Sequence, residues 1–350
     1  MVRNHSGPVA SMALCAAVLN LVAPGQARGQ QSYGIDFVTV GAPGNAAIND
    51  PNAPGNSRAQ GRGGVDYTYR IARYETTSAE WAQFLNAYAR QTSPNPFWSW
   101  DGPIFSGIGG NEFSGFYTIP STANLPVTGI TWRMAAMYCN WLSGGKGSNP
   151  ATLVTGAYDT TTWGNIAGGG FTDAPTHLPG ALFWIPTLDE ALKAAFYDPN
   201  RNGAGQGGYW TWRNSSDGPG ISGPPGVGTT SNAYHDPANN WAEWAIPLGS
   251  YPQSTSPWGL YDTSGGAREW CEDVFNDFVT GVPMYRTTEG SAAGDSSTLA
   301  ADFLHTAIGT YTPTERVSIQ GLRIAAAVPS PCTLGVFPIA MMSLFLRSRR

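Results

Sequence analysis

Cysteine has the most reactive side chain in this 350-residue chain, and its four positions limit what a thiol could do. Cys15 and Cys332 lie close to the two ends, whereas Cys139 and Cys271 lie in the interior. None of them belongs to a CxxC pair or to a Cys/His spacing typical of zinc. Cys139 and Cys271 could form a disulfide or be two buried thiols, and the sequence leaves both alternatives open.

Histidine, the usual general base and iron ligand, occurs in the interior only at isolated positions. His177, His235 and His305 do not form a 2-His-1-carboxylate site by their spacing, and an isolated histidine is more often an ordinary surface or core residue. A Ser nucleophile elbow and a phosphate-binding loop are also absent from the sequence. The Gly-rich runs at 107–110 and 168–170 lack a strand-to-helix context, so we interpret them as loops.

The composition narrows the class of protein. Charged residues make up 12% of the chain, which has 44 Gly, 27 Pro and 13 Trp, and this predicts a loop-rich fold with little helix. The net charge of -5 and the pI near 5.3 argue against a nucleic-acid partner, which needs clustered Lys and Arg.

The beginning of the chain, residues 1–27, has the pattern of a secretory signal peptide. Arg3 and His5 precede an apolar run at 9–22, and small residues lead to Ala27 as they do at a cleavage site. A membrane anchor is the alternative, but the apolar run is shorter than the roughly 20 residues that a span requires. We therefore expect export.

The end of the chain, residues 329–350, resembles a PEP-CTERM sorting tag of bacteria. A short Pro-containing motif at 328–331 is followed by a mostly apolar run at 332–346 and a basic terminus. Ser330 stands where such tags usually have Glu. The resemblance implies a sorting or processing enzyme as a partner, and a short tail anchor is the alternative. Both interpretations place the protein at the cell surface or outside the cell.

The residues between these two ends, 31–328, are predicted to form one domain of mixed α+β class. Residues 33–41 and 65–71 alternate as strands do. Capping residues and one-sided apolar stripes predict helices that begin near Thr77, Thr131 and Thr187. Glu80 and Glu190 complete capping boxes at the first and third of these helices.

Several interior segments, in the expected order, resemble the formylglycine-generating, or sulfatase-modifying, enzyme family. They are residues 69–77 with 84–87, 126–141, 184–187, 258–270 and 321–325. The run at 258–270, which ends in Glu269-Trp270, is the strongest match, although Gly266 replaces the family's usual Asn. The resemblance implies a loop-rich α+β domain related to the C-type lectin fold, with a small twisted sheet.

The same resemblance implies a calcium ion in this run. The matching ligands are Asp262, Gly265, Ala267 and Glu269. Two carboxylates and two carbonyls suit Ca²⁺, which binds oxygen ligands in loose geometry. The alternative is that Asp262 caps a turn and Glu269 pairs with an arginine.

For a second calcium site of the family, the nearest match is Asn232 with the carbonyl of Ala233. Further oxygen ligands could come from four nearby side chains, Asp236, Asn239, Asn240 and Glu243. Their spacing does not show which of them would bind, and a solvated polar loop is the alternative.

The cysteine pair that binds Cu(I) in the family's converting enzymes has no counterpart here. The aligned positions are Gly294 and about Leu299, and no cysteine occurs from Glu272 to Pro331. Since Cu(I) is a soft ion that prefers thiolates, we do not expect copper-dependent formylglycine formation.

Two hypotheses follow. The first is a non-catalytic binding module of the cell envelope, whose partner is a glycan, a peptide or an envelope protein. The second is an oxidoreductase of the family with other active-site ligands. If the first is right, the pocket floor near Gly294 and Leu299 should be apolar and lack a thiol or histidine. Loop tryptophans could contact a ligand or pack the core: Trp98, Trp100, Trp163, Trp210, Trp212, Trp241 and Trp244.

Overall fold

Strand β2 (Tyr69–Ala72) lies in the middle of the first sheet, between strands from the two ends of the domain. This computed structural model describes residues 31–89, 109–111, 116–118, 124–238, 242–294 and 298–329. The expected signal peptide, the C-terminal segment, Trp98, Trp100 and Trp241 lie outside the described residues. In the described part, no helix has the length and hydropathy needed to cross a membrane.

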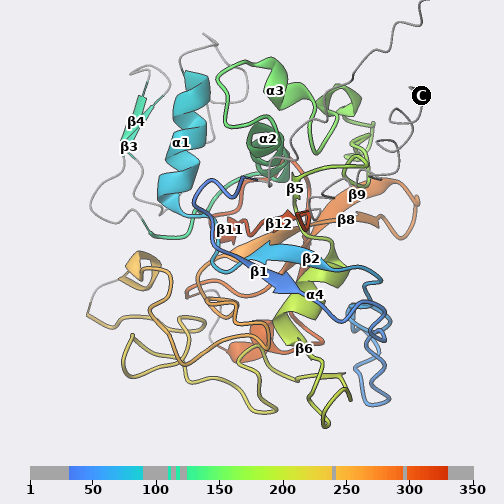
Figure 1. Cartoon of the computed structure of the whole chain (residues 1–350), viewed down its shortest axis with the longest axis vertical. Helices are drawn as coiled ribbons and strands as arrows, with labels where there is room; N and C mark the ends of the chain where they lie inside the picture. Colours follow the sequence, from blue (N-terminus) through green and yellow to red (C-terminus); the bar gives the residue numbers. More distant parts are fainter. Residues whose placement is uncertain are drawn as a thin grey trace, which may run out of the picture. The chain divides into compact units, whose positions relative to one another are not determined.

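The first sheet has the order β1-β2-β12-β5, and all its neighbours are antiparallel. Its other strands are β1 (Phe37–Val40), β12 (Ala325–Ala326) and β5 (Phe183–Trp184). Figure 1 shows that this sheet brings the early, middle and late parts of the domain together. The expected strands at 33–41 and 65–71 correspond to β1, which is shorter, and to β2, which is shorter and ends one residue later.

The second sheet has the order β10-β9-β8-β11. It contains β10 (Ile308–Tyr311), β9 (Pro283–Glu289), β8 (Arg268–Asn276) and β11 (Gln320–Gly321). Only the β11–β8 pair in this sheet is parallel. Two further pairs are short: β3 (Gly109–Asn111) with β4 (Phe116–Thr118), and β6 (Tyr197–Asp198) with β7 (Gly208–Tyr209). The mixed, loop-rich α+β class is confirmed, with several small sheets instead of one.

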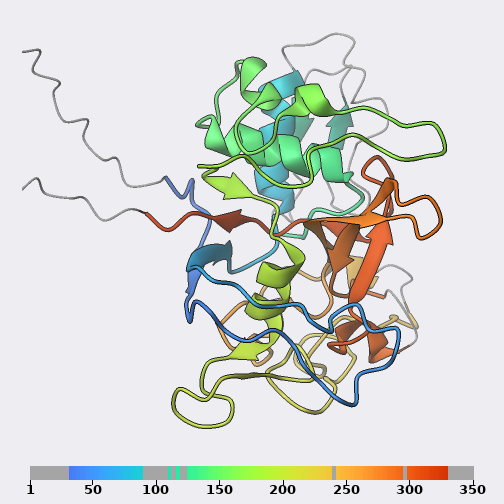
Figure 2. The same ribbon diagram turned by 90° about the vertical axis from the view of Figure 1, so that its right-hand side faces the viewer.

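The helices lie on both sides of the first sheet, as Figures 1 and 2 show together. Helices α1 (Ser78–Ala89) and α2 (Trp132–Ser143) lie on one side and α4 (Leu188–Phe196) on the other. The remaining helical turns are short: α3 (Ala151–Val154), η1 (Thr160–Thr162), η2 (Ala242–Ala245) and η3 (Leu299–Asp302).

The predicted helix starts are confirmed in atomic detail. Thr187 and Glu190 form a complete capping box, and Glu80 and Thr77 exchange the same pair of hydrogen bonds. In α2 the Thr131 hydroxyl accepts a hydrogen bond from the Met134 amide at 3.2 Å. These local bonds satisfy amides that the first helical turn leaves without a partner.

Cys139 and Cys271 are free, buried thiols, so the structure selects that alternative over the disulfide. Cys139 belongs to the main core between α1, α2 and the first sheet, whereas Cys271 belongs to a second core around α4. Burial raises the pKa of both thiols well above the usual value, and both are therefore unreactive.

Buried arginines hold the irregular segments against these cores. The Arg286 side chain donates to the carbonyls of Ala174, Pro175 and Glu272, and its guanidinium lies 3.7 Å from the ring centre of Trp132. Buried carbonyls outside helices and strands need such donors, because water cannot reach them.

Candidate functional site

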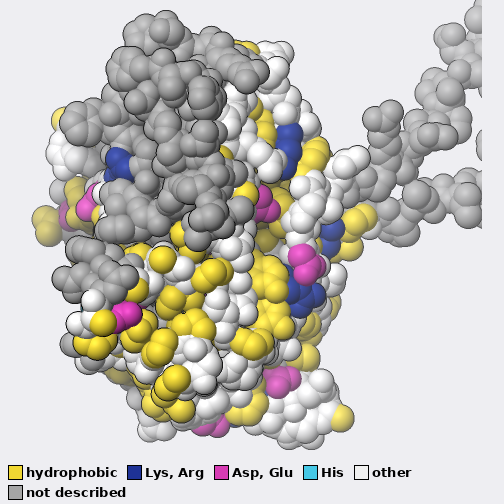
Figure 3. All heavy atoms as spheres, turned by 90° about the vertical axis from the view of Figure 1, so that its left-hand side faces the viewer, with side chains coloured by type: hydrophobic (Ala, Val, Ile, Leu, Met, Phe, Trp, Pro, Cys, Tyr) yellow, Lys and Arg dark blue, Asp and Glu magenta, His cyan; other side chains and the backbone are white. Residues whose placement is uncertain are grey.

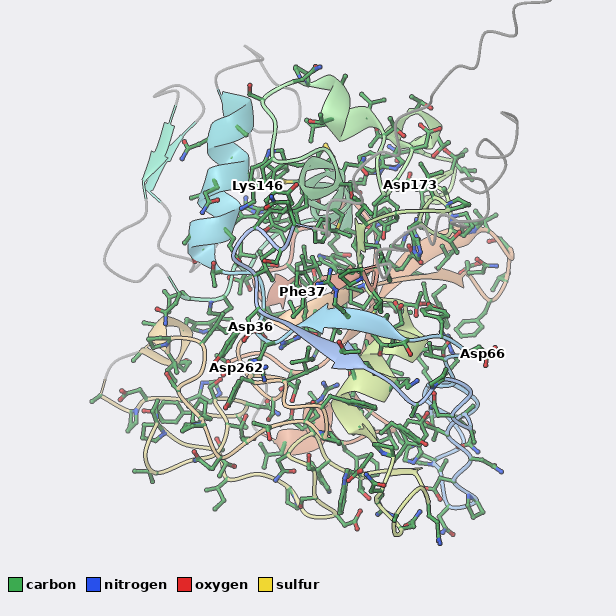
Figure 4. The ribbon with its side chains drawn as sticks, in the orientation of Figure 1. Asp36, Phe37, Asp66, Lys146, Asp173 and Asp262 are labelled. Atoms are coloured by element: carbon green, nitrogen blue, oxygen red, sulfur yellow. The ribbon has the colours of Figure 1, made fainter. Side chains whose placement is uncertain are left out.

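Asp262 lies in the turn within residues 258–270, at the position expected to bind calcium (Figure 4). Its backbone is left-handed, with a φ of 56°, and its Oδ2 accepts a hydrogen bond from the Gly249 amide at 2.6 Å. The side chain is buried, and this burial raises its pKa to about 6. Asp262 therefore joins two loop segments through a backbone amide.

Glu269, the second expected carboxylate ligand, pairs with Arg323. The Nε and Nη2 atoms of Arg323 lie 2.8 and 2.7 Å from Oε1 of Glu269. Arg323 also donates to the carbonyls of Ala72, Arg73 and Tyr261. The guanidinium thus neutralises Glu269 and connects the turn to the end of β2.

Glu75, which we had not predicted as a site residue, is a third carboxylate beside this turn. A Cβ atom added to Gly266 would lie 2.6 Å from both carboxylate oxygens of Glu75. Oε1 accepts a hydrogen bond from the Ala267 amide at 2.9 Å, and Oε2 is buried with no partner within the described ranges. Burial, followed by the charge of Glu269, raises the pKa of Glu75 well above its usual value. Gly266, where the family usually has Asn, leaves the space that the Glu75 carboxylate occupies.

Asn232, the residue matched to the second calcium site, is fully buried in a polar network. Its Nδ2 donates to Oδ2 of Asp302 at 2.9 Å, and its Oδ1 is buried with no partner in the part of the chain that the structure describes. Asp302 also accepts hydrogen bonds from the hydroxyls of Ser264 and Ser291, at 2.6 and 2.5 Å. Ala233 has a φ of 59°, so the chain turns sharply after Asn232.

Gly294, at the first expected cysteine position, packs against a carboxylate and an imidazole. A Cβ atom there would lie 3.1 Å from Oε1 of Glu243 and 3.3 Å from Cε1 of His235. Nδ1 of His235 lies 3.5 Å from the same Glu243 oxygen. The expectation of an apolar floor without histidine is therefore wrong. Leu299 is half-buried and begins η3.

A small cavity adjoins this position. It has a volume of about 10 Å³ and is lined by residues that include Glu243, Ser231, Thr128 and Gly266. The other oxygen of the Glu243 carboxylate, Oε2, is buried and has no hydrogen-bond partner among the described residues. A space of this size holds no more than about one water molecule.

A comparison with models of protein families identifies the family of this chain. The model of the sulfatase-modifying factor enzyme 1-like domain matches residues 30–328. The chain belongs to this family. A search of curated proteins found no match.

Solved structures with similar backbones are also found. A structure described as CarF is 19% identical, covers 84% of this chain and 98% of its own, and has a TM-score of 0.49. Variable protein 1 of Treponema denticola is 17% identical, with coverages of 83% and 94% and a TM-score of 0.47. PvdO from Pseudomonas aeruginosa is 16% identical, with coverages of 87% and 98% and a TM-score of 0.47.

In the family's turn, the two expected carboxylate ligands have other partners. The Arg323 guanidinium forms an ion pair with the Glu269 carboxylate, and the Gly249 amide donates a hydrogen bond to one oxygen of Asp262. Among the described residues, no group of three or more His, Cys, Asp or Glu side chains could hold a metal ion. These are the contacts of the alternative interpretation, a capped turn and an arginine pair. Asn232 differs, because its Oδ1 has no hydrogen-bond partner among the described residues.

The described histidines each lie beside a carboxylate, which their isolation in sequence did not indicate. His177 lies 2.9 Å from Glu272, and His305 lies 2.9 Å from Asp50. These partners are distant along the chain, so no local motif could reveal them.

The described loop tryptophans are half-buried, and several have partners within the domain. Trp163 lies under Arg133 and Trp210 under Arg201, with 5.5 and 4.7 Å between guanidinium and ring centre. The Trp212 ring centre lies 5.5 Å from that of Phe303. These contacts favour packing over ligand contact for the three rings.

Proposed function

We propose that this family member is an exported binding module of the cell envelope that is non-catalytic at the family's copper site. The observation that carries the proposal is Gly294, which stands at the position of the family's first copper cysteine. The carboxylate of Glu243 and the imidazole of His235 beside it were not expected for a binding module, and they count for the second candidate below. A carboxylate and an imidazole do not replace a soft dithiolate for Cu(I). The resemblances of the two ends to a signal peptide and a sorting tag support the envelope location.

An apolar protein segment is the partner that the surface supports best. Ile221 is 61% exposed and Val227 is 75% exposed, and both lie in the Pro- and Gly-rich loop that precedes Asn232. Figure 3 shows apolar side chains gathered on the lower half of one face of the molecule. Gathered apolar surface of this kind is typical of protein-binding sites.

Capture from envelope extracts tests this proposal. The full chain is immobilised beside the double variant Ile221→Asp/Val227→Asp and the control Val279→Asp, whose side chain is 93% exposed on the β8–β9 hairpin. We expect the parent and the control to retain the same envelope protein and the double variant to lose it. Equal capture by all three, or binding on a glycan array alone, would contradict a protein partner at this loop.

Calcium at Asn232 is the cofactor in this proposal, supported by the unpartnered Oδ1 of that residue. Calorimetric titration of Ca²⁺ into the parent, Asn232→Ala and Glu269→Ala distinguishes the two expected sites. We expect binding in the parent and in Glu269→Ala, and no binding in Asn232→Ala. Loss in Glu269→Ala alone would move the ion to the turn, and no heat in the parent would exclude it from both.

An oxidoreductase with other ligands is the second candidate, and the pair of His235 with Glu243 beside Gly294 favours it. Metal analysis of the purified full chain, together with oxygen uptake in the presence of thiol substrates, tests this candidate. Bound iron or copper that is lost in His235→Ala would support it. Absence of both metals and of oxygen uptake would exclude it and leave the binding module.

A further inference from the structure

Ser57, His305 and Asp50 form a hydrogen-bonded series far from the family's site in sequence. The Ser57 hydroxyl lies 2.8 Å from Nδ1 of His305, and Nε2 of His305 lies 2.9 Å from Oδ2 of Asp50. A serine, an imidazole and a carboxylate in this order are the three groups of a hydrolase triad, which is recognised by geometry and roles instead of sequence position.

The carboxylate determines which nitrogen of His305 can act as a base. The ionised Asp50 carboxylate can accept a hydrogen bond but cannot donate one. Nε2 of His305 therefore carries the proton, and Nδ1 keeps its lone pair for the Ser57 hydroxyl. The ring nitrogens are exchanged relative to the arrangement in chymotrypsin-like enzymes, but each plays the same role. The Asn52 amide, which donates to Oδ1, and His305 both lower the pKa of Asp50 and favour its charged form.

The surrounding backbone holds the three groups in place. Ser57 and Asp50 belong to one loop, whose base is closed by hydrogen bonds from Ile48 to Arg62 and from Gly61 to Ile48. Ile48 is buried in the second core, and His305 follows Leu304 of the same core. The His305 side chain is only 3% exposed, whereas the Asp50 side chain is 40% exposed. The base is thus fixed, and solvent reaches one side of the series.

Two cavities border His305 and provide room for a substrate. One, of about 450 Å³, is lined by Asp50 and His305 among others, and the other, of about 500 Å³, is lined by Ser57 and His305. The second cavity is also lined by Phe275, Phe278 and Ile308. Both volumes lie within the range of roughly 300–1,000 Å³ that is typical of ligand pockets.

We propose that Ser57, His305 and Asp50 are a catalytic triad that hydrolyses esters of apolar carboxylic acids. The acyl group lies in the cavity with Phe275 and Phe278. This activity is independent of the proposed binding function, because none of the three residues belongs to the surface loop or the Gly294 site.

The reaction has two balanced halves. The Ser57 Oγ attacks the ester carbonyl carbon while its proton moves to Nδ1 of His305; the C–O bond to the alcohol then breaks, and the alcohol takes that proton. Water attacks the acyl-serine in the same way, and the carboxylic acid leaves as Ser57 regains its proton. The amide of Arg58 directly follows the serine, lines the same cavity as Ser57 and donates no hydrogen bond within the described residues, so it is available to the oxyanion.

Active-site labelling and ester hydrolysis test the triad in the full chain. Diisopropyl fluorophosphate should modify Ser57, as located by peptide mass spectrometry, and p-nitrophenyl butyrate should be hydrolysed. We expect Ser57→Ala to lower kcat/KM at least about 100-fold and Asp50→Asn at least about tenfold, as removal of triad members does elsewhere. The exposed Ser32→Ala is the matched control and should leave the rate unchanged.

The same variants separate catalysis from a purely structural role. If the three residues only fix the loop, Ser57→Ala will lower the melting temperature while the parent shows neither labelling of Ser57 nor hydrolysis. That result would overturn the proposal. Hydrolysis that persists in Ser57→Ala, or a label on another serine, would overturn it as well.

Discussion

At the scale of single residues, the pair of Arg323 with Glu269 places two opposite charges in the protein interior. Their side chains are 1% and 10% exposed. Removing one partner of a buried pair leaves an uncompensated charge and costs about 3–5 kcal/mol. We therefore expect Arg323→Met to lower the free energy of unfolding by about this amount in urea titrations, because three carbonyls also lose their donor.

The pair of Arg201 with Asp217 is a suitable control, because the Asp217 side chain is 55% exposed. Exposed pairs contribute only about 0–1 kcal/mol, so Arg201→Met should change the unfolding free energy by no more than that. Equal losses in the two variants would contradict a special role for Arg323.

The raised pKa of Asp262 predicts a pH dependence of stability. Its pKa is about 6 in the folded chain and 3.8 in the reference state, so folding favours its protonated form. This stabilisation is complete below pH 4 and is lost as the pH rises to about 6, by up to about 3 kcal/mol. Asp262→Asn, which can still accept from Gly249, should therefore gain stability over the parent between pH 4 and pH 7.

Unfolding free energies of parent and variant, measured with a calcium chelator at the two pH values, check this expectation. The difference between the two proteins should grow toward pH 7. A constant difference would show that Asp262 has the same pKa in the folded and unfolded chains.

At the scale of elements, the capping box of α4 joins local and distant partners. Beyond the capping bond, the Glu190 carboxylate accepts hydrogen bonds from the Trp184 indole and the Tyr67 hydroxyl. Thr187→Ala removes the side-chain bond to the Glu190 amide and should cost about 1 kcal/mol of unfolding free energy. Thr187→Ser keeps a hydroxyl there and should cost much less; equal losses would point to packing of the methyl group instead.

The elements that the sequence predicted correctly are those with a local signal. The helices after Thr77, Thr131 and Thr187 have caps and apolar stripes within a few residues. Sheet order was not predictable, because β2 pairs with β12, about 250 residues later. The contacts of Glu75, of Asp302 and of the triad could not be predicted for the same reason. Glu75 with Ala267, Asp302 with Asn232, and Asp50 with His305 are 70 to 255 residues apart in the sequence.

At the scale of the whole domain, two hydrophobic cores stabilise a chain whose backbone is mostly irregular. Buried charged side chains hold the irregular segments in place where no helix or strand does so. Arg213 pairs with Glu289, and Arg286 donates hydrogen bonds to loop carbonyls. The family's matching segments, such as those around Arg323 and Glu269, belong to this scaffold. The scaffold can therefore persist although the copper residues are absent.

Replacing the two residues at the cysteine positions tests whether the scaffold still contains the family's metal site. Gly294 has a φ of 61°, a conformation that costs other residues roughly 1–2 kcal/mol. A Cys Cβ there would also approach Glu243 to 3.1 Å. We therefore expect Gly294→Cys/Leu299→Cys to be less stable than the parent and to bind no Cu(I) in competition with a chelator such as bathocuproine. Stoichiometric copper in this variant would mean that the cysteines alone distinguish the chain from the copper enzymes, whereas copper binding only after the additional change Glu243→Ala would identify that carboxylate as the obstacle.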